Sequence, residues 1–157
     1  MIEYPKTKGS YILVTKLMCE IQLNIGALGL TKFSPGLYLY CGSAHGPGGL
    51  NARINHHLRP SPRPTWHFDY LKPCIAIEEI WFMETREPYE CRFVKILAKM
   101  KDFKYPVYGF GSQDCHSGCI SHLVYFPLNI KVERIFQLVK EEVAGLMRAE
   151  LIGTSHN

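Results

Sequence analysis

The sequence predicts an α+β fold with a mostly antiparallel central sheet flanked by helices. About five segments show strand patterns and about four show helical patterns. Two of the strand segments follow each other directly near the start, and strands and helices do not alternate as regularly as a parallel βαβ array would require. The 157 residues, 46% of them hydrophobic, suffice to bury one core, so we expect a single domain over residues 1–157.

Strands are expected in the first part of the chain. Residues 11–18 are rich in β-forming side chains, and residues 20–25 alternate between polar and apolar. A short connection at Met18 and Cys19 predicts that these two segments form a hairpin. After a Pro-Gly turn, residues 37–41 predict a third strand.

Two helices are expected next. Leu50, Ile54 and His57 recur at helical spacing and predict an amphipathic helix, with Arg53 beside its apolar face. A short helix is expected over residues 66–72, between a threonine that suits an N-cap and a proline that ends it. A proline-rich stretch separates the two helices, so we expect them as distinct elements.

The second half continues in the same mixed pattern. Residues 74–85 predict the strongest later strand, and residues 89–100, which follow a proline, predict a helix. The glycine-rich and polar residues 105–119 predict a loop, and residues 120–126 predict a strand. Residues 130–151 carry apolar positions at helical spacing and predict a long C-terminal helix that covers the sheet.

The charge of the chain suits an anionic partner. The formal net charge is +4 and the pI is near 8.7, which favours approach to a polyanion. Basic residues gather before the first strand and around the predicted amphipathic helix, whereas acidic residues gather later in the chain. The basic group consists of Lys6, Lys8, Arg53, Arg59 and Arg63.

Other features predict a cytoplasmic protein. No run of about 18 or more apolar residues occurs, so we do not expect a membrane-spanning helix. The N-terminal residues lack the apolar stretch of a secretory signal. The six cysteines are therefore expected as reduced thiols.

Short motifs occur in a specific order along the chain. They are GSY at Gly9–Tyr11, YCG at Tyr40–Gly42, and then Arg53 and His57 in one predicted helix. This set resembles the GIY-YIG nuclease superfamily. The later segments TWHFDYL, EC and GFGSQDCHSGCISHL extend the resemblance to a branch catalogued as a domain of unknown function, which occurs in archaea and some bacteria and is sometimes fused to DNA glycosylases.

The resemblance implies a divalent-metal-dependent endonuclease that hydrolyses phosphodiester bonds in DNA repair or processing. Tyr11 or Tyr40, with a lowered pKa, would accept the proton of the attacking water or orient that water. Arg53 would bind two phosphate oxygens through its planar guanidinium, and His57 would donate or relay a proton. The implied partner is DNA, with DNA repair proteins as further candidates.

The resemblance also implies a magnesium or manganese ion, held by a glutamate on the helix after the third core strand. Glu90 lies near that place, and a carboxylate oxygen suits a hard cation. Glu84 and Glu87 are neighbouring alternatives. A glutamate at the start of a helix is also explained without a metal, by its interaction with the helix dipole.

The chain departs from the superfamily pattern in two ways. The gap between Tyr11 and Tyr40 is longer than usual, so an extra strand is expected between the two motifs. The segment after Tyr40 is also unusually rich in glycine. Backbone N–H groups at Gly42, Ser43 and Gly49 would contact a phosphate, or the glycines simply form a tight turn.

A second group of candidate residues lies at the end of the predicted loop. Cys115, Cys119 and His122 are residue types that bind zinc, but a structural zinc site needs four ligands. Candidates for a further ligand are Asp114, His116, His67 and Cys41. We favour a buried cysteine pair with a hydrogen-bonded histidine over a zinc site.

Three functions remain open from the sequence. The first is the DNA endonuclease, which needs a carboxylate beside the tyrosines. The second is a nucleic-acid-binding or protein-docking module on the same scaffold without cleavage, which needs only basic residues and aromatic stacking. The third is a structural zinc domain. His56, next to the predicted site, is expected at the surface.

Overall fold

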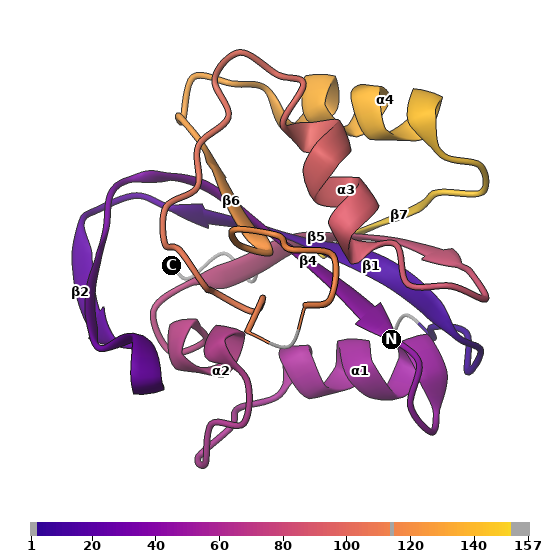
Figure 1. Ribbon diagram of the computed structural model, residues 1–157, viewed down its shortest axis with the longest axis horizontal. Coiled ribbons are helices and arrows are strands. Elements are labelled where there is room, and N and C mark those ends of the chain that lie inside the picture. The colour runs from indigo at the N-terminus through magenta and orange to yellow at the C-terminus, as the bar shows by residue number, and fades with distance from the viewer. Residues whose placement is uncertain (1–2, 114, 152–157) are drawn as a thin grey trace.

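The protein folds around a five-stranded antiparallel sheet with two helices on each face (Figure 1). The computed structural model describes residues 3–113 and 115–151. The strand order is β6-β4-β1-β5-β7, which confirms the predicted α+β class. The sheet consists of β1 (Gly9–Leu17), β4 (Gly36–Ala44), β5 (Ala76–Glu84), β6 (Leu123–Phe126) and β7 (Met147–Glu150), and the helices are α1 (Gly49–Leu58), α2 (His67–Leu71), α3 (Glu90–Leu97) and α4 (Val132–Glu142).

Strand β1 lies at the centre of the sheet because both of its edges are paired. It runs antiparallel to β4 on one side and antiparallel to β5 on the other. In this register Tyr11 lies opposite Gly42, and Ser10 lies opposite Ser43. The GSY and YCG motifs are far apart in sequence, yet they lie side by side on neighbouring strands.

The sheet separates two buried layers of side chains. Tyr38 and Tyr40 of β4 belong to the layer that α1 and α2 cover, whereas Leu39 and Cys41 belong to the layer that α3 and α4 cover. This alternation follows from the period of two along a strand. The two tyrosines therefore share one face, and the helix with Arg53 and His57 lies over it.

The residues between β1 and β4 form a separate small hairpin. The predicted strand over residues 20–25 exists as β2 (Ile21–Asn24), and after the 3-10 helix η1 (Gly26–Leu28) it pairs with β3 (Leu30–Phe33). The extra strand expected here is present, but the predicted hairpin between residues 11–18 and 20–25 is wrong. The reason is that β4 and β5 occupy both edges of β1, so β2 needs another partner.

The C-terminal segment is a helix followed by a strand. The predicted helix over residues 130–151 is present only as α4 and ends at Glu142. Gly145 has a φ of +79°, outside the helical range, and the chain then extends as β7 along β5. Strand β7 thus provides hydrogen-bonding partners for the outer edge of β5. The apolar side of α4 is buried on the sheet as predicted.

Helix α1 follows a turn that depends on its glycines. Gly49 has a φ of +56°, and a Cβ atom at this position would lie 2.2 Å from the carbonyl oxygen of Thr7. The apolar positions Leu50, Ile54 and His57 are buried, which confirms the face predicted from their spacing. The turn and the helix thus hold Arg53 and His57 close to the ends of β1 and β4.

Two predictions on compartment can be compared with the structure. Among residues 3–113 and 115–151, no helix has both the length and the apolar character needed to cross a membrane. The six cysteines are not joined in disulfides in this structure. Cys19 and Cys74 are exposed, Cys41 is buried, and three others lie partly buried near one another.

Candidate functional site

A buried tyrosine and a buried histidine are paired beneath α1. The Tyr11 hydroxyl and His57 Nε2 share a hydrogen bond of 2.7 Å, and the two side chains are only 1% and 3% exposed. Burial, together with the nearby charges of Lys72 and His56, lowers the pKa of His57 to about 3. His57 is therefore neutral at pH 7, and each of the two groups can donate or accept the shared proton.

Gly42 makes this pairing sterically allowed. A Cβ atom on Gly42 would lie 2.4 Å from both Cζ and Oη of Tyr11, far inside van der Waals contact. The ring of Tyr11 thus crosses the neighbouring strand where that strand has no side chain. The glycine of the YCG motif is explained by this contact.

Tyr40 lies on the same face of the sheet as Tyr11, next to the Tyr11–His57 pair. Its ring is 8% exposed, lies 5.9 Å from that of His57, and stacks on Phe68 at 5.3 Å between centroids. A Cβ atom on Gly111 would lie 3.0 Å from Tyr40 Oη, so the loop before β6 covers the hydroxyl.

Both tyrosines are neutral phenols in this structure. Burial raises the pKa of Tyr40 to about 12, although the positive charge of Arg53 acts in the opposite direction. Burial also raises the pKa of Tyr11 well above its ordinary value, and Tyr40 adds to this effect. The expected lowered tyrosine pKa is therefore wrong for the buried side chains seen here, because desolvation outweighs the nearby arginine. A neutral phenol can still orient a water by hydrogen bonding.

Arg53 lies at the rim of this buried group. Its guanidinium stacks over the ring of Trp66 at 4.4 Å from the centroid, and its Nη1 donates a hydrogen bond of 3.3 Å to the carbonyl oxygen of Ser43. Arg53, Trp66, Ala44 and Pro47 border a surface depression of about 270 Å³. The arginine is thus fixed by stacking while it faces a space large enough for a phosphate group.

Glu90 also contacts Ser43, the residue whose carbonyl oxygen Arg53 contacts. It is the first residue of α3, and its carboxylate accepts a hydrogen bond from the Ser43 hydroxyl, which is also 2.9 Å from the Ser10 hydroxyl. Arg53 contacts the carbonyl of Ser43, so the two charged residues lie on either side of one residue. The negative charge of Glu90 also contributes to the raised pKa of Tyr11.

Glu84 and Glu87 are placed differently. Glu84 accepts a hydrogen bond of 2.8 Å from the Thr7 hydroxyl at the end of β5, and the carbonyl of Glu87 accepts one from Thr85. Of these three glutamates, Glu90 is the one whose carboxylate accepts a hydrogen bond from Ser43.

The predicted phosphate-binding residues have unequal surroundings. Ser43 is partly buried between Arg53 and Glu90, as described above. Gly42 packs against Tyr11, and the N–H of Gly49 donates a hydrogen bond of 3.2 Å to the carbonyl of Gly46. Gly49 thus fits the tight-turn alternative, while Ser43 remains at the candidate site.

A buried carboxylate of the TWHFDYL segment, for which a role in the wall of the site was one of two alternatives, lies behind Trp66. Asp69 is 2% exposed, and it accepts hydrogen bonds from the N–H groups of Thr65 and Trp66 and from Lys72. Burial alone would raise the pKa of Asp69, but these hydrogen bonds lower it below its usual value. Asp69 therefore fixes the chain at Trp66, on which Arg53 stacks.

His56 is also tied to this network. Its side chain is 32% exposed, so it lies at the surface as expected, and its Nε2 also lies 3.0 Å from Asp69 Oδ1. The acidic partner is 13 positions away in the sequence and comes close only because α1 and α2 are adjacent. The TWHFDYL segment was the available signal, but its aspartate could not be assigned a partner.

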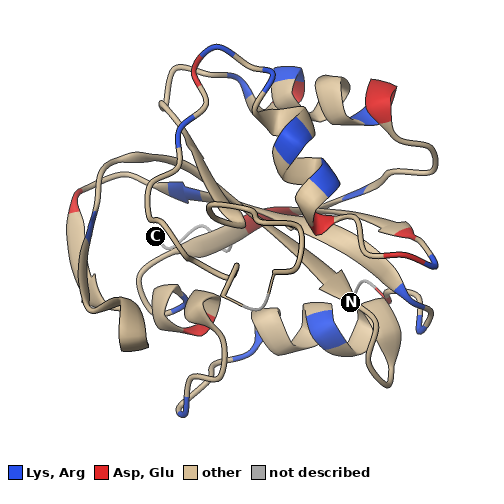
Figure 2. Cartoon of the chain, viewed as in Figure 1, with Lys and Arg blue, Asp and Glu red and all other residues tan. Residues whose placement is uncertain are grey.

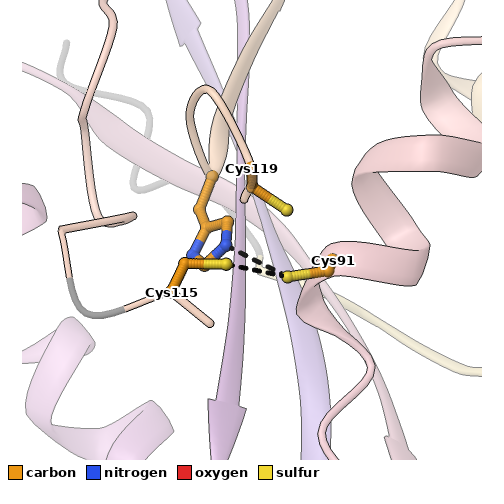
Figure 3. A group of neighbouring side chains, drawn as sticks. Cys91, Cys115 and Cys119 are labelled. Carbon is orange, nitrogen blue, oxygen red and sulfur yellow. Dashed lines mark hydrogen bonds between the residues drawn. The ribbon is translucent and has the colours of Figure 1, made fainter. Parts of the chain in front are cut away.

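Four potential metal ligands converge beside α3 (Figure 3). The ligand atoms of Cys91, Cys115, Cys119 and His122 all lie within 4.8 Å of one another. Cys91 Sγ is 3.3 Å from Cys115 Sγ and 3.5 Å from His122 Nε2. These four residues could hold a metal ion, and the sequence analysis had identified three of them.

The fourth member of the group differs from the candidates considered. It is Cys91 of α3, not His67 or Cys41, because α3 packs against the loop before β6. His67 Nδ1 instead accepts a hydrogen bond of 2.8 Å from the N–H of Gly111. Asp114, another candidate, lies outside the described residues. Helix packing brings Cys91 to the other three ligands, and no local spacing in the sequence could indicate this.

The comparisons with known proteins assign the chain to a family. Residues 10–145 match the family described as domain of unknown function DUF123, and the chain belongs to it. The matched range includes the tyrosines, Arg53, His57, Glu90 and the four cysteine and histidine ligands. No curated protein matches the chain. No solved structure matches it.

Proposed function

We propose that this DUF123-family protein is a divalent-metal-dependent DNA endonuclease that hydrolyses phosphodiester bonds as GIY-YIG nucleases do, in DNA repair or processing. The observation that carries the proposal is the convergence around the end of β4. Tyr11 and His57 share a hydrogen bond and the Tyr40 ring contacts His57 edge-on, and Arg53 and Glu90 both contact Ser43 beside them. These five residues come from four separate segments of the chain, and they are the residues that the resemblance implies.

Arg53 supplies the contact to the phosphate. Its guanidinium is held on Trp66, so little freedom is lost when it binds an anion. A planar guanidinium offers two parallel N–H donors to two phosphate oxygens, which stabilises the charge that develops in hydrolysis. Basic residues occur on both α1 and α3, which lie on opposite faces of the sheet (Figure 2).

Glu90 fits a magnesium or manganese ion. Its carboxylate stands at the rim of the buried group, and Mg²⁺ is often held by one or two carboxylates, with water and substrate phosphate as the other ligands. When bound, such an ion supplies charge neutralisation and a more acidic water. Ser43 orients the Glu90 carboxylate through its hydroxyl group.

The Tyr11–His57 pair positions groups while both members stay neutral. The 2.7 Å hydrogen bond fixes the orientation of the Tyr11 hydroxyl and of the His57 ring. Tyr40, also neutral, orients a water by hydrogen bonding. In this mechanism the tyrosines position groups, and a phenolate is not required.

One observation supports the second candidate, a nucleic-acid-binding module without cleavage. Tyr11 and His57 are almost fully buried, whereas Arg53 and Trp66 border an open depression. A module of this kind would use the arginine and the aromatic ring for binding and the buried pair for stability alone.

Cleavage of labelled DNAs tests the proposal. Single-stranded, duplex, flap and base-damaged substrates are incubated with magnesium, with manganese and with EDTA, using the native protein, Tyr40→Phe and Glu90→Gln. We expect metal-dependent nicking by the native protein and a loss of at least about 100-fold in each variant, since a positioned catalytic group contributes that much. Salt-sensitive binding without cleavage under any metal would instead favour the binding module.

Arg53→Lys sharpens the test. Lysine keeps the positive charge but loses the planar pair of donors, so we expect a loss of about 100-fold in cleavage with the fold unchanged. Arg63→Lys, at an exposed position, is the matched control and should cleave normally. Equal cleavage by Arg53→Lys and the native protein would remove Arg53 from the mechanism.

A further inference from the structure

We propose that Cys91, Cys115, Cys119 and His122 bind one zinc ion in a tetrahedral structural site. This site is separate from the proposed nuclease residues and does not depend on DNA cleavage. The proposal reverses the preference drawn from the sequence, in which a fourth ligand was missing.

The distances suit a single tetrahedral ion. Zinc–sulfur bonds of about 2.3 Å and zinc–nitrogen bonds of about 2.0 Å place neighbouring ligand atoms about 3.5 to 3.8 Å apart. The two measured separations, 3.3 Å and 3.5 Å from Cys91 Sγ, lie at or slightly below this range. All four ligand atoms lie within 4.8 Å of one another, so only small side-chain movements are needed for coordination.

The ligand chemistry favours zinc over a hard cation. Three thiols and one imidazole match a Cys₃His structural site, whereas magnesium prefers oxygen ligands. Cys115 and Cys119 are separated by three residues, a spacing common in zinc sites, and both lie on a turn-rich loop. Four protein ligands leave no open position for a substrate, which indicates a structural role.

The segment that carries the ligands is held at its base, where the N–H groups of Gly109 and His122 donate hydrogen bonds to the carbonyls of Ile120 and Phe110, and the turn with Cys115 and Cys119 lies beyond these contacts. Residues 98–122 join α3 to β6 without a helix or strand among the described residues. Loops of this length in compact domains are uncommon unless something else orders them. His122 is already anchored, because its carbonyl accepts a hydrogen bond of 2.9 Å from the N–H of Cys41. A zinc ion would fasten the rest of the loop to this anchor and to α3.

A zinc ion at this position would also stabilise two parts of the candidate active site. Cys91 follows Glu90 directly in the first turn of α3, and Gly111 of the same loop lies against Tyr40. One cross-link therefore holds the helix start that carries Glu90 and the loop that covers Tyr40. Loss of the ion should loosen both.

Metal analysis of the purified full chain tests the site. Protein expressed with added zinc and kept reduced is analysed by elemental mass spectrometry, and we expect about one zinc per chain, the stoichiometry of one four-ligand site. Cys119→Ser should lose most of the zinc. Cys74→Ser, at an exposed cysteine outside the group, is the matched control and should retain it.

Cobalt substitution covers the case in which Cys119→Ser fails to fold. Native protein stripped of metal and loaded with Co²⁺ should show the visible absorption of tetrahedral cobalt bound to thiolates, and added zinc should abolish it. Protein that binds neither metal with all thiols reduced overturns the proposal, as does equal zinc loss from Cys74→Ser. The measurement uses no DNA, so absence of cleavage would count against the nuclease and leave the zinc site standing.

Discussion

The two faces of the central sheet use the same strands for different purposes. The layer under α3 and α4 is almost entirely apolar, with Leu39, Trp81 and Phe93 at its centre. The layer under α1 and α2 contains the Tyr11–His57 hydrogen bond among its apolar residues. Burying a polar group costs free energy unless it is hydrogen-bonded. The first layer is thus apolar at its centre and has Glu90 and Cys91 only at the start of α3, while the second contains the buried polar pair.

Removing a large side chain from the apolar layer should have the largest effect on stability. Phe93→Ala should lower the free energy of unfolding by about 3–5 kcal/mol, because a fully buried ring leaves a cavity. Tyr40→Phe is the contrasting variant on the other face. Among the described residues, no protein group hydrogen-bonds to Tyr40 Oη, so we expect a loss of less than about 1 kcal/mol.

Chemical denaturation of the two variants, together with the cleavage assay, checks this contrast. Phe93→Ala should cleave DNA normally per folded molecule, whereas Tyr40→Phe should be stable and inactive. A stable Phe93→Ala protein, or a strongly destabilised Tyr40→Phe protein, would contradict the division of the two faces.

A methyl group at Gly42 should have an intermediate effect. Gly42→Ala forces a Cβ atom to within 2.4 Å of the Tyr11 ring, so we expect a loss of about 1–3 kcal/mol and displacement of the tyrosine. Gly46→Ala is the matched control, because a Cβ atom there meets nothing within 4 Å. Thermal unfolding measures both. Equal stability of the two variants would show that Tyr11 does not lie across β4.

Acid should lower the stability of the polar face gradually, by a small amount for each pH unit. The folded pKa of His57 is about 3 and its ordinary value is 6.5, so the unfolded chain binds more protons between these pH values. The free energy of unfolding should therefore fall as the pH drops from about 6.5 towards 3, by at most about 1.4 kcal/mol per pH unit for this one group. His57→Gln should reduce that slope.

Denaturation at a series of pH values measures the slope. His116→Gln, at an exposed histidine, is the control and should leave it unchanged. Two identical slopes for the native protein and His57→Gln would mean that His57 is not buried as a neutral group.

Much of the local structure could be predicted because hydrophobic periodicity is a local property. The apolar positions of residues 49–58 and the strand pattern of residues 74–85 were sufficient to identify α1 and β5. The motif order also identified Arg53, His57 and Glu90 as candidates that the fold brings close to the two tyrosines. Their role in cleavage is a prediction that the experiments above would test.

Long-range pairing could not be predicted from such patterns. Residues 11–18 and 20–25 are adjacent and both form strands, but β1 pairs with β4 and β5 instead of β2. The apolar spacing of residues 147–150 continues that of a helix. They form a strand instead, because Gly145 has a positive φ and the edge of β5 is available for pairing. In both cases a sheet edge decided the outcome, and edges exist only after folding.

The sequence by itself determined which residue types could form a site and which segments favour a helix or a strand. Only the tertiary structure decided which residues meet: Tyr11 with His57, Ser43 with Arg53 and Glu90, and Cys91 with Cys115, Cys119 and His122. The physical reason is that side-chain spacing acts over a few residues, whereas metal ligands and hydrogen-bonded pairs are selected by the packing of elements far apart in the chain.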